Sequence, residues 1–249
     1  MIEDWIVPDW PAAPQVRAVS TTRLGGFSRG PWASMNPATH VGDDPASVRA
    51  NRKALQQGLR LPAEPRWLQQ VHGTTVIDAA EPVAAGEVPV ADAAQCSQPG
   101  AVCVVMTADC LPVLLCDAVG RQVGALHAGW RGLAAGVIEQ TIDAMQPPGE
   151  ALLAWLGPAI GPDAYQVGDE VRDVFLGHDQ QAEAAFQPCP DGSWKVDLYR
   201  LARQRLEERG VTAIYGGHEC SFTDAERFFS YRRDGVTGRM ATLIWLEDL

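Results

Sequence analysis

Hydrophobic residues recur at helical spacing in three stretches of the chain, and each stretch has its own start or stop signal. Residues 45–58 follow Asp44, which suits the cap of a helix, and they begin with a proline, which is tolerated in the first turn. Residues 198–209 follow Asp197 and end before a glycine, which favours helix termination. Residues 133–145 end before a pair of prolines. The pattern therefore predicts three helices.

Shorter apolar stretches between these helices are typical of β-strands. Several are apolar on both faces, which predicts sheets covered by helices. Two of them, 112–118 and 121–128, are separated only by Val119 and Gly120, which predicts an antiparallel pair. We therefore predict an α+β fold with mixed sheets rather than a doubly wound one, as a single domain over residues 1–249, because no long linker interrupts the chain. The predicted strands are 16–22, 74–79, 101–107, 112–118, 121–128, 151–157, 211–216, 228–233 and 240–246.

The balance of charges disfavours nucleic acid as a partner. The 249 residues include 31 acidic and 20 basic side chains, which give a formal net charge of −11 at pH 7. A protein that binds nucleic acid needs basic side chains to displace counterions from the phosphates, and here the overall charge has the opposite sign. We therefore expect small molecules as partners.

No segment is typical of export or of membrane insertion. The densest apolar stretch, 101–116, is interrupted by Asp109 and Pro112 and is too short to span a bilayer. The first residues carry acidic side chains and no basic segment before an apolar run, unlike a signal peptide. We expect a cytoplasmic protein without a membrane partner, whose six cysteines are reduced thiols.

Two histidines and one cysteine are the strongest candidates for chemistry. His72 lies in QVHG, Cys110 in TADCLP and His127 in HAGWRG, and each is predicted at a strand end beside a turn. A thiolate and two imidazoles form a ligand set for Zn²⁺ that leaves one position open. The same surroundings would lower the pKa of Cys110 and make it a nucleophile. Since their spacing is not a specific motif, the alternative is that the histidines are ordinary strand-end residues and Cys110 is a small buried one.

The other cysteines and histidines carry weaker signals. Cys103 and Cys116 lie within apolar stretches, and we expect them in the core. His40 lies in a polar stretch, and we expect it on the surface. Cys220 is two residues from His218, but two ligands are too few for a metal site, so a loop thiol is the better interpretation.

Four arginines next to glycine-rich turns are candidates for binding phosphate. A guanidinium group near flexible backbone suits recognition of phosphate or carboxylate, and a helix that begins after Arg131 would add its N-terminal dipole. The alternative for any one of them is simple solvation of a hairpin. The candidates are Arg23, Arg131, Arg233 and Arg239.

Eight segments between residues 20 and 239 resemble, in the same order, the bacterial laccase-domain family, also called multicopper polyphenol oxidase or YfiH/PgeF-like proteins. The segments are spread over nearly the whole chain, and HAGWRG and TADCLP are the most specific of them. The segments are TTRLGGFSRG, SMN, VGDDPASVRANR, QVHG, TADCLPVLL, HAGWRGL, LGPAIG and FFSYRRDGVTGR.

The resemblance implies a CNF/YfiH-like α+β fold of layered mixed sheets and helices. It implies a catalytic zinc site whose ligands fall on His72, Cys110 and His127, with copper as the other metal to consider. It also implies phosphorolysis of purine nucleosides (adenosine, inosine, guanosine and methylthioadenosine) and deamination of adenosine. Polyphenol oxidation and editing of peptidoglycan precursors are further activities attributed to such proteins.

The residues favour phosphorolysis among these activities. A multicopper oxidase needs a His₂Cys site and a separate histidine-rich copper cluster, and the chain has only five histidines. We therefore predict a purine nucleoside phosphorylase with an adenosine deaminase side activity, as a monomer or weak homodimer. The alternatives are an amide hydrolase that acts on cell-wall precursors, with Cys110 as nucleophile and His127 as base, and a metal-binding protein without catalysis.

Overall fold

The structure is a computed structural model that describes residues 4–84 and 86–248. Its largest sheet has six strands in the order β11-β7-β5-β6-β3-β2. The pairs β11–β7 and β2–β3 are parallel, and the other three pairs are antiparallel, so the sheet is mixed. Its strands are β2 (Val76–Asp78), β3 (Ala93–Cys96), β5 (Leu111–Asp117), β6 (Val123–Ala128), β7 (Leu152–Leu156) and β11 (Ala213–Gly216).

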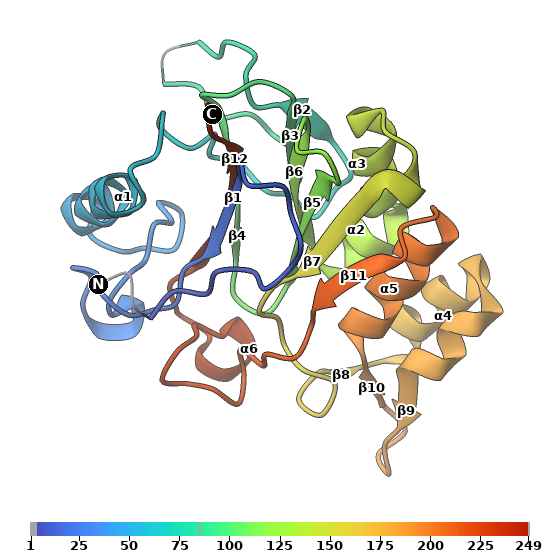
Figure 1. The fold of residues 1–249 in the computed structure, drawn as a ribbon. Coiled ribbons are helices and arrows are strands. Elements are labelled where there is room, and N and C mark those ends of the chain that lie inside the picture. The colour runs from blue at the N-terminus through green and yellow to red at the C-terminus, as the bar shows by residue number, and fades with distance from the viewer. Residues whose placement is uncertain (1–3, 85, 249) are drawn as a thin grey trace.

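A second sheet joins the two ends of the chain. The strands β1 (Val16–Ser20) and β4 (Val102–Thr107) flank β12 (Met240–Leu246), and both pairs are antiparallel. In Figure 1 the dark-red β12 lies beside the blue β1, next to the six-stranded sheet. One apolar cluster contains Cys103 and Ile244 from the second sheet and Leu114 and Cys116 from β5, so the two sheets pack face to face.

The central strand β5 shows why the chain forms layers. Successive side chains of a strand point to opposite faces, and β5 is buried on both. Leu114 packs toward the second sheet, while Val113 and Leu115 belong to the cluster that includes the helices. The longer helices lie on either side of the sheets (Figure 1). They are α1 (Pro45–Leu59), α2 (Trp130–Ala135), α3 (Val137–Met145), α4 (Asp169–His178) and α5 (Leu198–Glu208).

The helices lie on the two outer sides of the paired sheets. Residues of α2, α3, α4 and α5 share one apolar cluster with the six-stranded sheet. On the opposite side, Leu55 of α1 packs in a cluster with Leu243 of β12. The layers are therefore helix, three-stranded sheet, six-stranded sheet and helices, which confirms the predicted α+β fold with layered mixed sheets.

The two capped helices are confirmed, and the third prediction is corrected. Asp44 accepts a hydrogen bond from the backbone N–H of Ser47, and Asp197 accepts one from Arg200. The predicted helix 133–145 is two helices, α2 and α3, because Gly136 between them adopts a φ of 99°. Glycine reaches this left-handed conformation without a steric penalty and ends α2 there.

The predicted strand 228–233 is wrong. Phe228 and Phe229 are buried, but the hydroxyl of Ser230 caps a short helix, α6 (Tyr231–Asp234), by accepting from the N–H of Arg233. A local side-chain cap therefore outweighs the strand tendency of the aromatic residues. The sequence also gave no signal for α4 or for a small third sheet of β8 (Gln166–Val167), β10 (Trp194–Val196) and β9 (Phe186–Pro188).

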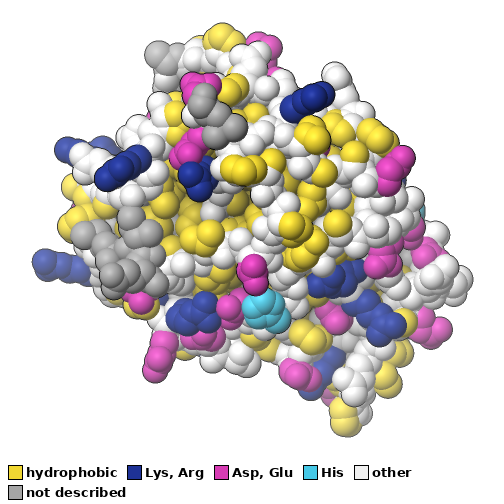
Figure 2. Space-filling view, in the orientation of Figure 1, with side chains coloured by type: hydrophobic (Ala, Val, Ile, Leu, Met, Phe, Trp, Pro, Cys, Tyr) yellow, Lys and Arg dark blue, Asp and Glu magenta, His cyan; other side chains and the backbone are white. Residues whose placement is uncertain are grey.

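The face of the molecule shown in Figure 2 carries charges of both signs and no basic patch. On the face shown, Lys and Arg side chains are interspersed with Asp and Glu, and hydrophobic side chains gather across its middle. Within residues 4–84 and 86–248, no helix combines the length and the apolar character that crossing a membrane requires.

Candidate metal centre

His72, Cys110 and His127 come together where the chain crosses between the two sheets. Their ligand atoms all lie within 4.8 Å of one another, although 38 residues separate His72 from Cys110. Cys110 lies in the turn from β4 to β5, and His127 lies near the end of β6, as expected. His72 lies in a loop before β2 rather than at a strand end. The structure therefore brings together all three predicted ligands.

A buried carboxylate, Asp92, holds both histidines in place. Its Oδ1 lies 2.8 Å from Nδ1 of His127, which turns the other ring nitrogen of His127 toward the cluster. Asp92 also accepts the backbone N–H groups of Val71, His72 and Gly73, at 3.2, 2.9 and 2.7 Å. These bonds fix the loop that presents His72, whose φ is 61°. A histidine ligand commonly donates its second nitrogen to such a carboxylate.

A second carboxylate shapes the turn that presents Cys110. Asp109 has a φ of 90°, a conformation that non-glycine residues adopt only when the surroundings enforce it. Its Oδ1 accepts the hydroxyl of Ser221, and its Oδ2 accepts the backbone N–H of Arg232, both at 2.7 Å. The C-terminal segment therefore fixes the turn at the cysteine.

Gly129 leaves no space between the centre and the start of α2. A Cβ atom at this position would lie 2.6 Å from Cδ2 of His72 and 3.0 Å from Sγ of Cys110. Its φ of −63° is open to any residue, so close packing and not backbone freedom requires a glycine here.

The electrostatics of the three residues favour a thiolate. Burial by itself would raise the pKa of Cys110, but the charge and hydrogen bonds of His127 and His72 outweigh it and lower the pKa to about 6. Burial would likewise lower the pKa of His127, but Cys110 and Asp92 outweigh it and raise the pKa. Burial also opposes ionisation of Asp92, yet hydrogen bonds from His127 and from the loop lower its pKa.

This donor set fits a metal ion. The Sγ of Cys110 lies 3.7 Å from Nε2 of His72, and the ligands of a tetrahedral zinc ion lie about 3.5 Å apart, given Zn–S and Zn–N bonds of about 2.3 and 2.0–2.1 Å. A thiolate with two imidazoles suits zinc and also copper. The structure therefore contains a possible metal-binding site.

The centre opens into a cavity of about 470 Å³, here called the metal-centre cavity. Two of the four candidate arginines, Arg131 and Arg239, line it. His40, which the sequence predicted on the surface, is exposed but also lines this cavity. Burial and the nearby Arg239 and Arg52 lower the pKa of His40.

The other two candidate arginines are used elsewhere, away from the lining of that cavity. Arg23 donates to the carbonyl oxygens of Ala33 and Ala225 and stacks on the ring of Phe229. The guanidinium of Arg233 donates to the carbonyls of Ser221, Phe222 and Phe228 and pairs with Asp234. The guanidinium of Arg23 therefore joins an N-terminal loop to the C-terminal segment, and that of Arg233 joins loops within the C-terminal segment.

Sequence reasoning missed Asp92 and His40 as parts of the site. Asp92 is a lone carboxylate with alanines on both sides in the sequence, and only its complete burial beside His127 marks its role. Among the cysteines, Cys103 and Cys116 are confirmed in the core, where burial raises the pKa of both thiols.

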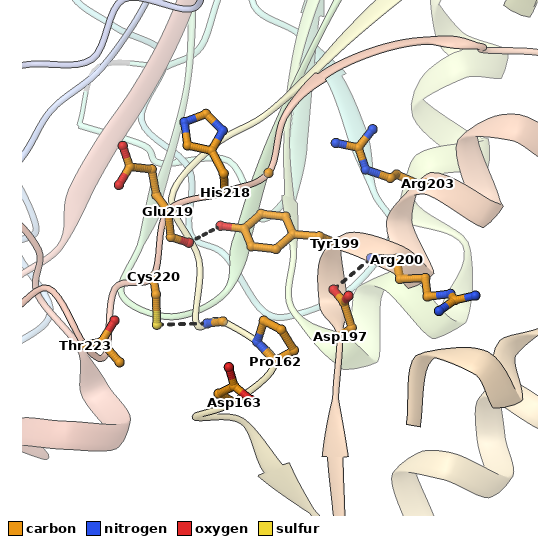
Figure 3. A pocket seen from close by; sticks show the side chains of 12 residues that line it. Pro162, Asp163, Asp197, Tyr199, Arg200, Arg203, His218, Glu219, Cys220 and Thr223 are labelled. Atoms are coloured by element: carbon orange, nitrogen blue, oxygen red, sulfur yellow. Dashed lines mark hydrogen bonds between the residues drawn. The ribbon is translucent and has the colours of Figure 1, made fainter. Parts of the chain in front are cut away.

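Another cavity, about 500 Å³, lies apart from these ligands. It is drawn in Figure 3, where His218 and Cys220 from the loop after β11 face Tyr199 and Arg203 of α5. A further group of possible ligands, Glu139, His178 and Glu208, has acidic and largely exposed members, and Glu139 already pairs with Arg205. The chemistry therefore concentrates at the first centre.

The fold and the site together define two packed sheets that carry one cysteine and two histidines able to hold a metal ion. The family model described as multi-copper polyphenol oxidoreductase laccase matches residues 17–247, and the chain belongs to that family. The match confirms the resemblance found in the sequence.

Known relatives extend over the whole chain. Purine nucleoside phosphorylase PA4543 of Pseudomonas aeruginosa is 53% identical over 245 residues, which cover 98% of this chain and 99% of the relative. Purine nucleoside phosphorylase YfiH of Escherichia coli K12 is 52% identical over 242 residues, covering 97% and 98%. The crystal structure of protein NMB0706 of Neisseria meningitidis is 49% identical, with a TM-score of 0.94, and covers 98% of this chain and 100% of that chain.

Proposed function

We propose that this protein is a zinc-dependent purine nucleoside phosphorylase. The observation that carries the proposal is that Arg131 and Arg239 line the same cavity as His72, Cys110 and His127. Guanidinium groups suit the oxygens of phosphate. Relatives with about half of their residues identical bear the name purine nucleoside phosphorylase, which supports the same assignment.

The proposed reaction transfers a ribosyl group to phosphate. An oxygen of hydrogenphosphate bonds to C1′ of the ribose, the C1′–N9 bond breaks with its electron pair on the purine, and the proton of hydrogenphosphate ends on the purine. Positive charge develops on the ribose, so an anion fixed beside it stabilises the transition state. Arg131 and Arg239 would fix that anion. A zinc ion held by His72, Cys110 and His127 would supply a Lewis acid that orients the substrate.

The positive charge of the arginines at the site has to overcome the repulsion between phosphate and an acidic protein. One guanidinium group about 4 Å from a phosphate contributes about 4 kcal/mol per unit charge at an effective dielectric constant of 20, before desolvation. Acidic groups more than about 8–10 Å away are largely screened at physiological salt. Within the described residues, no acidic side chain pairs with Arg131 or Arg239. Two such arginines therefore suffice to attract phosphate despite the net charge of −11.

Product analysis tests this proposal. Zinc-loaded protein with inosine should form ribose 1-phosphate only when phosphate is present, and chelation should abolish it. Replacing Arg131 or Arg239 by alanine should raise the KM for phosphate far more than the KM for the nucleoside. The matched replacement Arg23→Ala should leave the KM for phosphate unchanged, because Arg23 bonds to backbone carbonyls outside the cavity. Free ribose as the product would reject phosphorolysis.

We propose adenosine deamination as a side activity of the same centre. In this reaction water adds at C6 of the purine and ammonia leaves, so inosine is the product. Ammonia release from adenosine in phosphate-free buffer measures it. No release from zinc-loaded protein that is active with inosine and phosphate would remove this side activity.

One observation favours a second candidate, a cysteine-dependent amide hydrolase acting on peptidoglycan precursors. Cys110 contacts His127, and His127 contacts Asp92, so the three residues could act as a nucleophile, a base and a carboxylate that orients the base. This reaction would be independent of phosphate and metal, and Cys110→Ser would abolish it. Release of an amino acid from a cell-wall precursor by the chelated protein would favour this candidate over the phosphorylase.

The histidine count argues against a multicopper oxidase. Of the five histidines, His72 and His127 belong to the centre, and His178 lies against Glu208. His40 and His218 line different cavities and cannot build a histidine-rich copper cluster. Any oxidation of polyphenols would therefore depend on a single copper ion at the centre.

A further inference from the structure

A second, smaller cavity lies on the other side of Cys110. It measures about 130 Å³, and we call it the aromatic recess. Ala108, Cys110 and Tyr231 line both the aromatic recess and the metal-centre cavity, so the two spaces adjoin at the cysteine. A ligand that passes this point would contact both.

The two spaces have different chemistry. The metal-centre cavity carries Arg131, Arg239 and His40. The recess is formed mainly by apolar and aromatic side chains, of which Trp130 and Tyr165 are half-buried. At the start of α2, Trp130 lines the recess and Arg131 lines the metal-centre cavity. The guanidinium of Arg131 stacks on the Trp130 ring, 4.3 Å from its centre, so one face of the ring is covered and the other remains for a ligand. The anionic part of a ligand therefore suits the larger cavity and an aromatic part suits the recess.

The size of the recess limits what it can hold. An apolar protein cavity of about 150 Å³ takes up benzene. The recess is slightly smaller and adjoins the larger cavity, so a single six-membered ring fits inside it and the rest of a flat ring system would extend through the opening, without room for a sugar phosphate as well.

The side chains that line the recess favour a ligand that accepts hydrogen bonds. Both oxygens of Asp109 already accept hydrogen bonds, from Ser221 and from the backbone of Arg232. The guanidinium of Arg232 lies 5.1 Å from the centre of the Tyr165 ring and donates through one nitrogen to the carbonyl of Gln166. Since a guanidinium carries five N–H groups, donors remain for a ligand. In nucleic acids arginine pairs with the O6 and N7 acceptors of guanine, and N7 remains an acceptor for a single N–H in the other purines.

We propose that the aromatic recess binds the purine ring of the substrate, with Trp130 as the stacking surface and Arg232 as the donor to ring nitrogen N7. The inference rests on the proposed phosphorolysis. It places the ribose beside Cys110 and the phosphate at Arg131 and Arg239. N7 is common to adenine, hypoxanthine and guanine, so the recess accepts 6-amino and 6-oxo purines alike.

Equilibrium binding of free bases tests the recess without turnover. Trp130→Ala should weaken binding of adenine to the zinc-loaded protein about tenfold or more, and Trp130→Phe should retain most of it, because stacking on an aromatic ring carries the affinity. Arg232→Ala should weaken binding of adenine but not of 7-deazaadenine, which has a C–H in place of N7. The matched control is Arg200→Ala, an exposed arginine at the separate cavity of Figure 3, which should change neither.

Several outcomes would overturn the assignment. These are no adenine binding by the wild-type protein, equal adenine binding by wild type and the Trp130 and Arg232 variants, or an equal loss for adenine and 7-deazaadenine in Arg232→Ala. In turnover, Arg232→Ala should raise the KM for inosine and leave the KM for phosphate within about twofold, because Arg232 does not line the metal-centre cavity, and the reverse would place phosphate in the recess. If the wild-type protein forms no ribose 1-phosphate, the proposed phosphorolysis is rejected. The adenine-binding measurements still decide whether the recess binds a purine ring.

Discussion

At the scale of single residues, two carboxylates outside the ligand set determine the geometry of the centre. Asp92 orients His127 and fixes the loop of His72, and Asp109 fixes the turn of Cys110. Both act on backbone and side chain at once, and both are buried. Groups in this position are expected to tune a metal site without touching the metal.

Replacing Asp92 by asparagine tests this role. The amide still fills the space but loses the negative charge and part of the acceptor capacity, so zinc affinity should fall by about 10- to 100-fold. Competition with a chromophoric chelator measures it. Asp117→Asn is the matched control, because Asp117 is also a buried carboxylate that accepts two backbone N–H groups, from Arg121 and Gln122, far from the centre. Equal zinc affinity in both variants would contradict the role of Asp92.

The thiol of Cys110 should show its low pKa in the metal-free protein. The thiolate is present above pH about 6 and is lost below it, so alkylation by iodoacetamide should rise through this pH and level off near pH 7. Cys116, whose pKa burial raises to about 12, should stay unmodified. Peptide mapping by mass spectrometry measures both, and bound zinc should protect Cys110. Equal labelling of the two thiols at pH 7 would show the prediction to be wrong.

At the scale of elements, the centre depends on how closely α2 approaches the sheet crossing. Arg205 of α5 is buried and donates to the carbonyls of Leu133 and Ala134, which anchors α2 from the other side. Gly136 ends α2 and allows α3 to continue along the six-stranded sheet. The C-terminal end of the helix that carries Trp130 and Arg131 is therefore fixed.

Adding one methyl group at Gly129 should disturb the centre without unfolding the protein. The new Cβ would overlap His72 and crowd Cys110, so Gly129→Ala should lower zinc affinity and turnover at least tenfold. Gly177→Ala is the control, because nothing lies within 4 Å of a Cβ there and the position is helical. That control should stabilise the protein by about 0.5–1 kcal/mol. Full zinc affinity in Gly129→Ala would refute the steric argument.

At the scale of the whole molecule, the apolar clusters of the core do not include the three candidate ligands. Separate clusters fill the space between the sheets and on both outer faces, and they contain most of the large buried side chains. A chain of this length buries enough surface to fold without staples. The centre lies at the edge of these clusters, where the chain crosses between the sheets.

Chelation should therefore abolish activity and leave the fold unchanged. The far-UV circular dichroism of the protein should remain unchanged at room temperature, while the Tm falls by the amount that loss of a bound ligand explains. Thermal unfolding of zinc-loaded and chelated protein measures both. Loss of secondary structure on chelation would make the metal structural.

The sequence by itself determined the features that act over a few residues. Asp44 and Asp197 cap helices because their side chains reach N–H groups three residues away, and apolar runs such as 112–118 form strands because both faces are buried. The motifs around His72, Cys110 and His127 also sufficed to indicate the ligands through the family they resemble.

Only the tertiary structure decided which distant groups meet. Pairing of β3 with β6 places Asp92 beside His127, 35 residues away, and no local pattern records that contact. All four candidate arginines follow or precede glycine-rich turns, yet packing places only Arg131 and Arg239 at the metal-centre cavity. Arg239 also donates to the carbonyls of Thr237 and Gly238, whereas Arg23 and Arg233 bond to carbonyls away from the lining of that cavity. The physical reason is that local propensity acts along the chain, whereas the composition of a site depends on which strands and loops pack together.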